Sequence, residues 1–185
     1  VDQFLEDAFE YDVDALCEGL SEPAEVSYAP PPDRSARYVR GDPRALVRVL
    51  DNLLNNALQH GGGAVELGWS RGDGTREPPG EAVVQGFRAR SGPWVEFRVA
   101  DRGPGIPPAE REKIFQPFYR LESSRNRRTG GSGLGLAIVK QLCQSHGWWL
   151  TVADRRGGGS VFRVVVPVED EAGAQGSSEP DSRAA

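Results

Sequence analysis

Methionine is absent from the 185 residues, and cysteine and histidine occur only twice each. Because position 1 is also not methionine, we expect the chain to be a piece of a longer protein. Cys17 and Cys143 lie far apart in apolar helical patterns, which favours buried free thiols over the alternative, a disulfide, and is typical of a reducing cytoplasm. No apolar run approaches the ~20 residues of a membrane span, and no signal peptide is present, so we expect a cytoplasmic domain.

An excess of positive charge is also missing. The chain has 22 Lys and Arg against 27 Asp and Glu, which gives a net charge of -5. A nucleic-acid surface would need clustered excess Lys and Arg, so we expect no nucleic-acid partner. The hydrophobic and charged contents, 38% and 26%, are those of a soluble globular protein, and the length suits one domain with a real core.

The first 40 residues combine helical and extended patterns. Apolar spacing over residues 1–20 is mostly helical, and Asp12 or Asp14 can start a second helix within that stretch. Residues 22–29 and 36–40 are predicted to be short strands joined by a proline-rich turn.

The rest of the chain predicts an α+β domain. Asp42 as N-cap and Pro43 at the first helical position begin a long amphipathic helix that ends at Gly61. The other expected elements are strands near 64–69 and 94–100, a helix over 134–146, and strands over 148–154 and 160–166. Residues 71–92 are interpreted as an exposed hairpin loop. We expect a two-layer α/β sandwich, with a mixed, mostly antiparallel sheet and helices on one face.

Three asparagines stand close together in the first long helix. Asn52 and Asn56 are four residues apart and therefore share a helical face. Asparagine is unfavourable inside helices because it competes for backbone hydrogen bonds. An amide oxygen is a hard, neutral ligand that suits Mg²⁺ beside phosphates. The alternative is a polar helix face whose amides are satisfied locally.

A carboxylate and two glycines follow the strand that ends at residue 100. Asp101 can accept a hydrogen bond from an exocyclic amine such as that of adenine, while Gly103 and Gly105 permit a close backbone approach. The alternative interpretation is an ordinary Asx turn at the end of a strand.

A glycine loop precedes the second long helix. Gly131, Gly133 and Gly135 lead directly into the first helical turn, whose free N–H groups and positive dipole end favour phosphates. No Lys-Ser or Lys-Thr pair follows, as a P-loop would require. Residues 122–129 before it are polar and basic, so they are not the strand of a Rossmann turn.

In this order and spacing, the three motifs resemble the N box, G1 box and G2 box of the Bergerat-type ATP-binding fold. Histidine kinases, gyrase-type ATPases, Hsp90 and MutL share that fold. The stretch Lys-Ile-Phe-Gln-Pro-Phe-Tyr-Arg at 113–120 resembles the F box of histidine kinases. The resemblance covers residues 41–167 and implies ATP and Mg²⁺ as cofactors.

The resemblance also implies a role for individual residues. Asn56 is the expected ligand of Mg²⁺, and Asp101 the partner of the adenine amine. The full implied nucleotide-binding set is Asn52, Asn56, Gln59, His60, Asp101, Gly103, Gly105, Ile106, Tyr119, Gly131, Ser132, Gly133, Leu134, Gly135 and Leu136. Residues 107–131 would form a lid anchored by Phe115 and Phe118. With Asn56, Arg120, Arg125, Arg127 and Arg128 are catalytic candidates that would neutralise the transferring phosphoryl group; the alternative for each arginine is a solvated loop.

Position 52 separates the subclasses of the superfamily. Its ATPases carry a glutamate there, one helical turn before the Mg²⁺ ligand, where it activates water. Asn52 is a poor general base, which favours phosphoryl transfer over hydrolysis. Two departures from the kinase pattern are Gln59, where a basic residue is common, and Trp148, where many relatives have glycine and where we expect a change of packing.

A histidine kinase also needs a phosphoacceptor histidine on a dimerising helical hairpin. Neither His60 nor His146 has the acidic residue and proline that typically follow it. We expect His60 at the pocket edge, His146 as a helix cap, residues 1–10 as a remnant of the hairpin, and residues 11–168 as the catalytic ATP-binding domain. Residues 169–185 are expected to be a disordered tail.

The expected partners are the kinase's own dimerisation domain and, indirectly, a response regulator. The fragment itself is expected to be monomeric, and its parent anchored in the inner membrane. Two alternatives stay open: a serine kinase of the anti-sigma-factor type, and a regulatory module that binds nucleotide without transferring phosphate.

Overall fold

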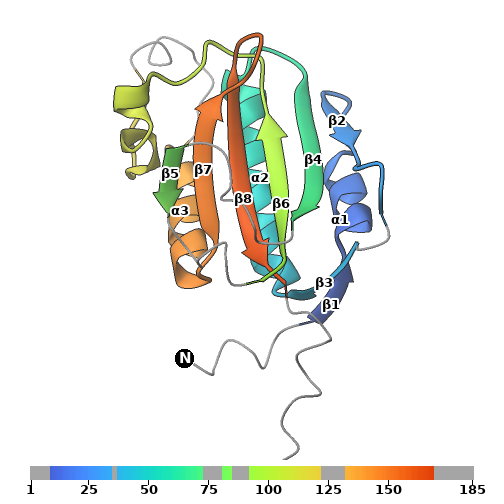
Figure 1. Cartoon of the computed structure of the whole chain (residues 1–185). Coiled ribbons are helices and arrows are strands. Elements are labelled where there is room, and N and C mark those ends of the chain that lie inside the picture. The colour runs from blue at the N-terminus through green and yellow to red at the C-terminus, as the bar shows by residue number, and fades with distance from the viewer. Residues whose placement is uncertain (1–8, 35–36, 73–80, 85–91, 122–131, 169–185) are drawn as a thin grey trace, which may run out of the picture.

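The computed structural model describes residues 9–34, 37–72, 81–84, 92–121 and 132–168 (Figure 1). Its strands are β1 (Phe9–Asp12), β2 (Val26–Ala29), β3 (Tyr38–Gly41), β4 (Val65–Gly72), β5 (Glu81–Val84), β6 (Trp94–Ala100), β7 (Trp149–Asp154) and β8 (Ser160–Pro167). Its helices are α1 (Val13–Leu20), α2 (Pro43–His60) and α3 (Gly135–Ser145), with two short 3-10 turns, η3 (Pro108–Glu110) and η4 (Lys113–Phe115).

The described elements form two layers. Six strands make one sheet in the order β2-β4-β6-β8-β7-β5, and α2 and α3 lie behind it in Figure 1, on one face. Among the described strands of this sheet, β2 and β4 pair in parallel and every other neighbouring pair is antiparallel. The predicted two-layer α/β sandwich with a mixed, mostly antiparallel sheet is therefore confirmed.

Helix α2 supplies much of the core. Its apolar stripe faces the sheet, and each fully buried leucine contributes roughly 2 kcal/mol of hydrophobic stabilisation. The buried residues of the stripe are Ala45, Leu46, Val49, Leu50, Leu53, Leu54 and Ala57. As predicted, Asp42 caps the helix by accepting from the backbone N–H groups of Arg44 and Ala45, at 2.9 and 3.1 Å. The ladder stops where the N–H of Gly61 donates to the carbonyl of Ala57.

Helix α3 packs beside α2, and a histidine joins their ends. His146 is the C-cap residue of α3, with Nδ1 3.0 Å from the carbonyl of Leu142 and Nε2 3.5 Å from Oδ2 of Asp42. The predicted capping role is confirmed. Trp148 is buried and its ring centroid lies 4.8 Å from that of His146, so this departure from the kinase pattern does serve packing.

The two cysteines are free and buried, as predicted. Burial raises the pKa of each thiol to about 12, with the carboxylate of Asp14 adding to the shift at Cys17. Both are therefore neutral and unreactive at neutral pH. No helix within the described residues combines the length and the apolar character that a bilayer crossing requires.

The N-terminal part of the chain differs from its prediction. Residues 9–12 form β1, antiparallel to β3, and Asp12 then caps α1. Residues 9 and 10 therefore do not belong to a hairpin helix, and residues 1–8 lie outside the described part. The two predicted strands before α2 are present as β2 and β3, and they enter different sheets: β2 lies beside β4 and β3 beside β1. Short apolar runs fit either period, and the distant partner decides between them.

A further strand lies inside the predicted loop 71–92. β5 is the edge strand beside β7, and Val84 at its end is buried. Its apolar residues are too few to show a period among the surrounding glycines, prolines and charges, and its pairing partner is distant in sequence. β4 also extends to Gly72, three residues beyond its predicted end. The predicted tail, 169–185, lies outside the described residues.

A buried polar cluster ties α1 to the sheet. Asp14 is only 5% exposed, and its carboxylate accepts from the Trp69 indole N–H at 3.2 Å and from the Tyr28 hydroxyl. Arg34 Nη1 donates to the other carboxylate oxygen at 2.8 Å. Burial alone raises the pKa of Asp14, but the hydrogen bonds from Tyr28 and Trp69 and the ion pair with Arg34 outweigh it and hold the pKa below its usual value.

Replacing Asp14 with asparagine should lower the free energy of unfolding at pH 7 by about 2 kcal/mol, because the Arg34 ion pair is lost and the amide fits its donors poorly. The folded-state pKa of Asp14 lies below the unfolded value of about 4, so the carboxylate stabilises the protein above that pH and loses this effect as the pH falls through the folded pKa. Urea denaturation measures this, and the difference in the free energy of unfolding between wild type and Asp14→Asn should become smaller as the pH falls below about 4.

The matched control is Glu18→Gln. The side chain of Glu18 is 59% exposed and lies 3.8 Å from the same Arg34 nitrogen, so its loss should change stability by less than about 0.5 kcal/mol. Equal effects of the two variants at pH 7 would contradict the role assigned to the buried cluster.

Candidate nucleotide-binding site

A cavity of about 440 Å³ opens where α2 ends, β6 ends and α3 begins. Residues of all three predicted motifs line it, together with parts of the segment that follows the G1 motif. The lining residues are Asn52, Asn55, Asn56, Gln59, His60, Asp101, Pro104, Gly105, Ile106, Ile114, Tyr119, Arg120, Leu121, Ser132, Gly133, Gly135, Leu136, Ile138 and Ser160. The structure thus brings together segments that are far apart in the sequence.

The amides of α2 form one wall of the cavity. Burying the apolar stripe against the sheet turns the opposite face of the helix, with Asn52, Asn55 and Asn56, toward this space. The Nδ2 group of Asn52 donates to the carbonyl of Arg48 at 2.7 Å, so part of this side chain is satisfied within its own helix. A Cβ added at Gly135 would lie 3.0 Å from Asn52 Oδ1, so this oxygen faces the start of α3.

Asp101 is 6% exposed and contacts both the cavity and the sheet. Its Oδ1 accepts from the backbone N–H groups of Gly103, at 2.8 Å, and Ser160, at 3.2 Å. The first bond is the Asx turn of the alternative interpretation, and it coexists with a place in the cavity wall. Both bonds use Oδ1, which leaves Oδ2 able to accept from a ligand.

Gly103 and Leu134, which the predicted set included, do not line the cavity. A Cβ at Gly103 would lie 2.8 Å from the carbonyl oxygen of His60 and 3.0 Å from Cα of Gly61. This glycine therefore lets the G1 loop pack on the end of α2. Leu134 is the N-cap residue of α3, and its carbonyl accepts from the N–H of Ile138.

The glycine loop is described only from Ser132 onward. Gly133 has a φ of 69°, and its carbonyl accepts from the N–H of Phe118 at 2.9 Å, which ties the loop to the F-box segment. Gly135 is the first residue of α3. Of the predicted residues of this region, Gly131, Arg125, Arg127 and Arg128 lie outside the described residues.

The F-box segment is anchored by one of its two phenylalanines. Phe115 is buried, with its ring 6.1 Å from that of Phe162 in an edge-to-face arrangement. The prediction that Phe118 also packs on the body of the domain is wrong, because its side chain is 73% exposed. The backbone of Phe118 has a φ of 64° and is bound to Gly133, and this left-handed turn directs the side chain outward.

Several lining residues carry no signal that the sequence motifs would reveal. Pro104, Ile114, Leu121 and Ile138 supply apolar surface, and such residues resemble core residues until the fold is known. Asn55 adjoins the predicted amides, and its side chain is rotated about 100° around the helix from that of Asn56. Ser160 had one visible signal, the three glycines that precede it at the start of β8.

Comparisons with known proteins agree with this geometry. The family model described as histidine kinase-, DNA gyrase B-, and HSP90-like ATPase matches residues 41–170. The sensor-like histidine kinase SenX3 of Mycobacterium tuberculosis is 37% identical over 134 residues, which are 72% of this chain and 28% of SenX3. The sensor histidine kinase CpxA of Escherichia coli is 35% identical over 128 residues, 69% of this chain and 24% of CpxA.

Solved structures lead to the same group. The mycobacterial sensor histidine kinase MprB has a TM-score of 0.60 and 28% identity, with 86% of this chain and 98% of that chain covered. Full-length ShkA in complex with AMPPNP has a TM-score of 0.63 and 26% identity, with 87% of this chain and 31% of ShkA covered. The chain spans about a quarter of the length of the curated relatives SenX3 and CpxA.

With a family model over most of its length and sensor kinases among its relatives, the chain belongs to the histidine kinase-, DNA gyrase B- and HSP90-like ATPases and is homologous to the ATP-binding domains of sensor histidine kinases.

Proposed function

We propose that the chain is the catalytic part of a sensor histidine kinase, which transfers the γ-phosphoryl group of ATP to a histidine on a separate dimerisation domain. Position 52 carries the choice between kinase and ATPase. Its amide is bonded to the carbonyl of Arg48 and faces Gly135, and an amide cannot take a proton from water as a carboxylate does. ATP held here is therefore directed to an external acceptor.

The base of ATP fits the end of the cavity that contains Asp101. Ile106, Ile114 and Ile138 offer an apolar surface for a flat ring. Asp101 Oδ2 is the acceptor for the exocyclic amine, since Oδ1 is occupied by two backbone N–H groups. A carboxylate at this point also disfavours guanine, which carries a carbonyl oxygen in place of that amine.

The phosphates and Mg²⁺ fit the other end, between α2 and the start of α3. The first turn of α3 offers free N–H groups and a positive dipole end, beside Ser132 and Gly133. Asn56 is the ligand we assign to Mg²⁺, because hard oxygen donors are what this ion prefers. The described residues include no cluster of three His, Cys, Asp or Glu side chains able to hold a metal. Phosphate oxygens of the nucleotide would supply further ligands. Bound there, Mg²⁺ supplies charge neutralisation of the phosphates.

Arg120 is the remaining catalytic candidate within the described residues. It lines the cavity directly after Tyr119, whose hydroxyl donates to Glu110 and so fixes this part of the segment. A guanidinium in this wall can neutralise the charge that develops on the transferring phosphoryl group. Arg125, Arg127 and Arg128 are proposed for the same task, in the segment outside the described residues.

The acceptor must come from another domain. His60 lines the ATP cavity, and His146 caps α3, where it contacts Asp42 and Trp148. Both histidines therefore have positions in this fold that do not suit a phosphoacceptor, which must be accessible on another domain. We infer that the partners are the kinase's own dimerisation domain and, after it, a response regulator.

Phosphoryl transfer is tested by mixing the chain with ATP radiolabelled at the γ-phosphate and a separately produced dimerisation domain of the parent kinase. The dimerisation domain should acquire label that acid removes and alkali does not, as expected of phosphohistidine. The control is the same domain with its acceptor histidine replaced by glutamine. Acid-stable label on serine, or label on the control, would contradict the proposed acceptor.

Asn56→Ala should remove the part of ATP affinity that depends on Mg²⁺, a loss of about tenfold or more, since one direct metal ligand disappears. Calorimetric titrations with ATP in Mg²⁺ and in EDTA measure this directly, and the two affinities should become nearly equal in the variant. Asn56 is only half-buried, so the protein should stay folded.

The neighbouring Asn55→Ala is the matched control for Asn56→Ala. It removes the same amide from the same helix and the same cavity wall, but from a side chain that points in another direction. Asn55→Ala should keep the Mg²⁺ dependence. An unchanged Mg²⁺ dependence in Asn56→Ala would remove this residue from the metal site.

A further inference from the structure

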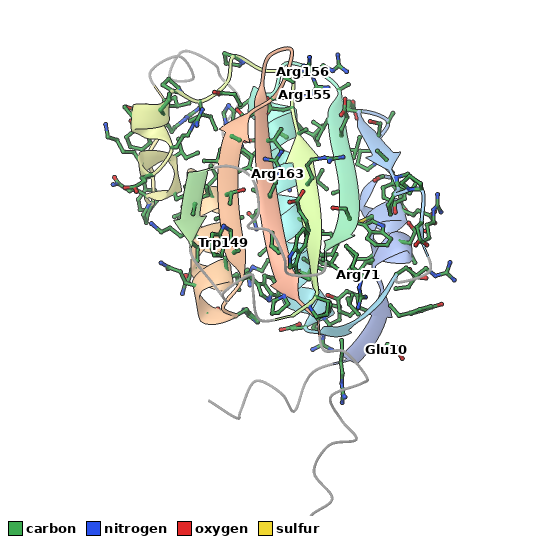
Figure 2. All side chains as sticks on the ribbon, viewed as in Figure 1. Glu10, Arg71, Trp149, Arg155, Arg156 and Arg163 are labelled. Atoms are coloured by element: carbon green, nitrogen blue, oxygen red, sulfur yellow. The ribbon has the colours of Figure 1, made fainter. Side chains whose placement is uncertain are left out.

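The turn between β7 and β8 lies beside the adenine end of the cavity and carries two neighbouring residues of opposite charge. Figure 2 shows Arg155 and Arg156 at this turn, at one end of the sheet. Asp154 Oδ1 lies 2.7 Å from Nη2 of Arg111, and Arg155 Nη2 lies 2.7 Å from Oε1 of Glu66. The turn therefore holds two different segments through two adjacent ion pairs.

The ion pair between Arg155 and Glu66 reaches the residue next to Asp101. Glu66 Oε1 on β4 accepts from Arg155 and also from Arg102 Nη2 at 3.2 Å, and Arg102 directly follows Asp101. Partial burial raises the pKa of Glu66, but the two guanidinium groups outweigh it and hold the pKa below its usual value. The side chains of Arg155 and Glu66 are 16% and 38% exposed, so this pair is partly shielded from solvent.

The backbone of the same turn holds Asp101 itself. The N–H of Asp101 donates to the carbonyl of Ser160 at 3.0 Å, and the N–H of Ser160 donates to Asp101 Oδ1 at 3.2 Å. Gly159, just before Ser160, has a φ of 98°, and a Cβ there would overlap the carbonyl group of Asp101. The turn and the end of β6 are thus in direct backbone contact.

The ion pair between Arg111 and Asp154 reaches the other end of the G1 loop. Arg111 is buried, and its Nε donates to the carbonyl of Ile106 at 3.2 Å while Nη2 binds Asp154. Ile106 lines the cavity, where it provides apolar surface. Asp101 and Ile106 delimit the loop, and the one turn therefore restrains both of its ends.

We propose that the β7–β8 turn, through Arg155 and Asp154, positions the loop 101–106 for adenine recognition. This inference rests on the proposed function, since it assigns adenine to that end of the cavity. Arg155 and Glu66 keep the carboxylate of Asp101 aimed at the exocyclic amine, and Arg111 and Asp154 keep Ile106 against the ring. All four are positioning residues, because none of them lines the cavity.

A comparison of the affinities for two ligands distinguishes an effect on the position of Asp101 from a general loosening of the domain. ADP carries the exocyclic amine, while purine riboside 5′-diphosphate has hydrogen in its place. Calorimetric titration of both gives a preference for ADP, and Asp101→Asn defines how much of that preference depends on the carboxylate. Arg155→Gln should weaken ADP binding by about fivefold and analogue binding by less than twofold, as the loss of one partly buried ion pair suggests.

The matched control is Arg156→Gln, which removes the same charge from the next residue of the same turn. Arg156 is exposed and has no ion pair with any described residue, so both affinities should stay within twofold of wild type. Glu66→Gln removes the shared acceptor from a different strand and should reproduce the selective loss of ADP affinity. Melting temperatures of all variants show that each is folded under the titration conditions.

Failure of nucleotide binding and failure of the role of the β7–β8 turn give different results. A wild-type chain that binds neither nucleotide overturns the proposed function. If the wild type binds ADP with a preference that Asp101→Asn abolishes, but Arg155→Gln behaves as Arg156→Gln does, the role of the turn is overturned. Equal losses for ADP and the analogue in both Arg155→Gln and Glu66→Gln also overturn it, because they indicate loosening without an effect on Asp101.

Discussion

Packing of α2 against the sheet is the constraint from which the site follows. The apolar stripe of this 18-residue helix can be buried in one rotational setting, and that setting fixes the direction of every polar side chain on the opposite face. Asn52 and Asn56 reach the cavity because Leu50 and Leu54 reach the core. The capped start at Asp42 and the stop at Gly61 then place the end of the helix beside the loop that carries Asp101.

Features that depend on local interactions could be predicted from the sequence. α2, β6 and α3 have strong periods and clear start and stop residues, and their predicted bounds agree with the structure to within a residue or two. β1 could not be found because it lies in a stretch whose apolar spacing is mostly helical, and β5 because its few apolar residues lie among glycines, prolines and charges. The spacing of the motifs predicted that their residues share one site, but it did not predict that Ile114, Leu121 and Ile138 also line it.

Some residues of the motifs line the cavity, and others hold neighbouring segments of the fold together. Gly103 is predicted to approach the nucleotide base, and the protein atoms nearest to it belong to His60, Gly61 and Asp101. Close approach of two backbones and close approach of a ligand require the same residue, glycine, so the motif alone does not tell them apart. Phe118 was predicted to be buried and is exposed, because its backbone has a positive φ that no sequence pattern indicates.

Three segments from distant parts of the chain meet at Asp101: the end of β6, the end of α2 and the start of β8. The N–H of Arg102 donates to the carbonyl of Gly61, and Ser160 closes the other side. A nucleotide at the proposed site would contact segments whose approach to one another costs chain entropy when the domain folds. It therefore acts as a non-covalent crosslink: by mass action, nucleotide at a hundred times its dissociation constant adds about 2.7 kcal/mol to the stability of the folded domain. Binding of nucleotide at the proposed site would therefore stabilise this domain independently of any phosphoryl transfer.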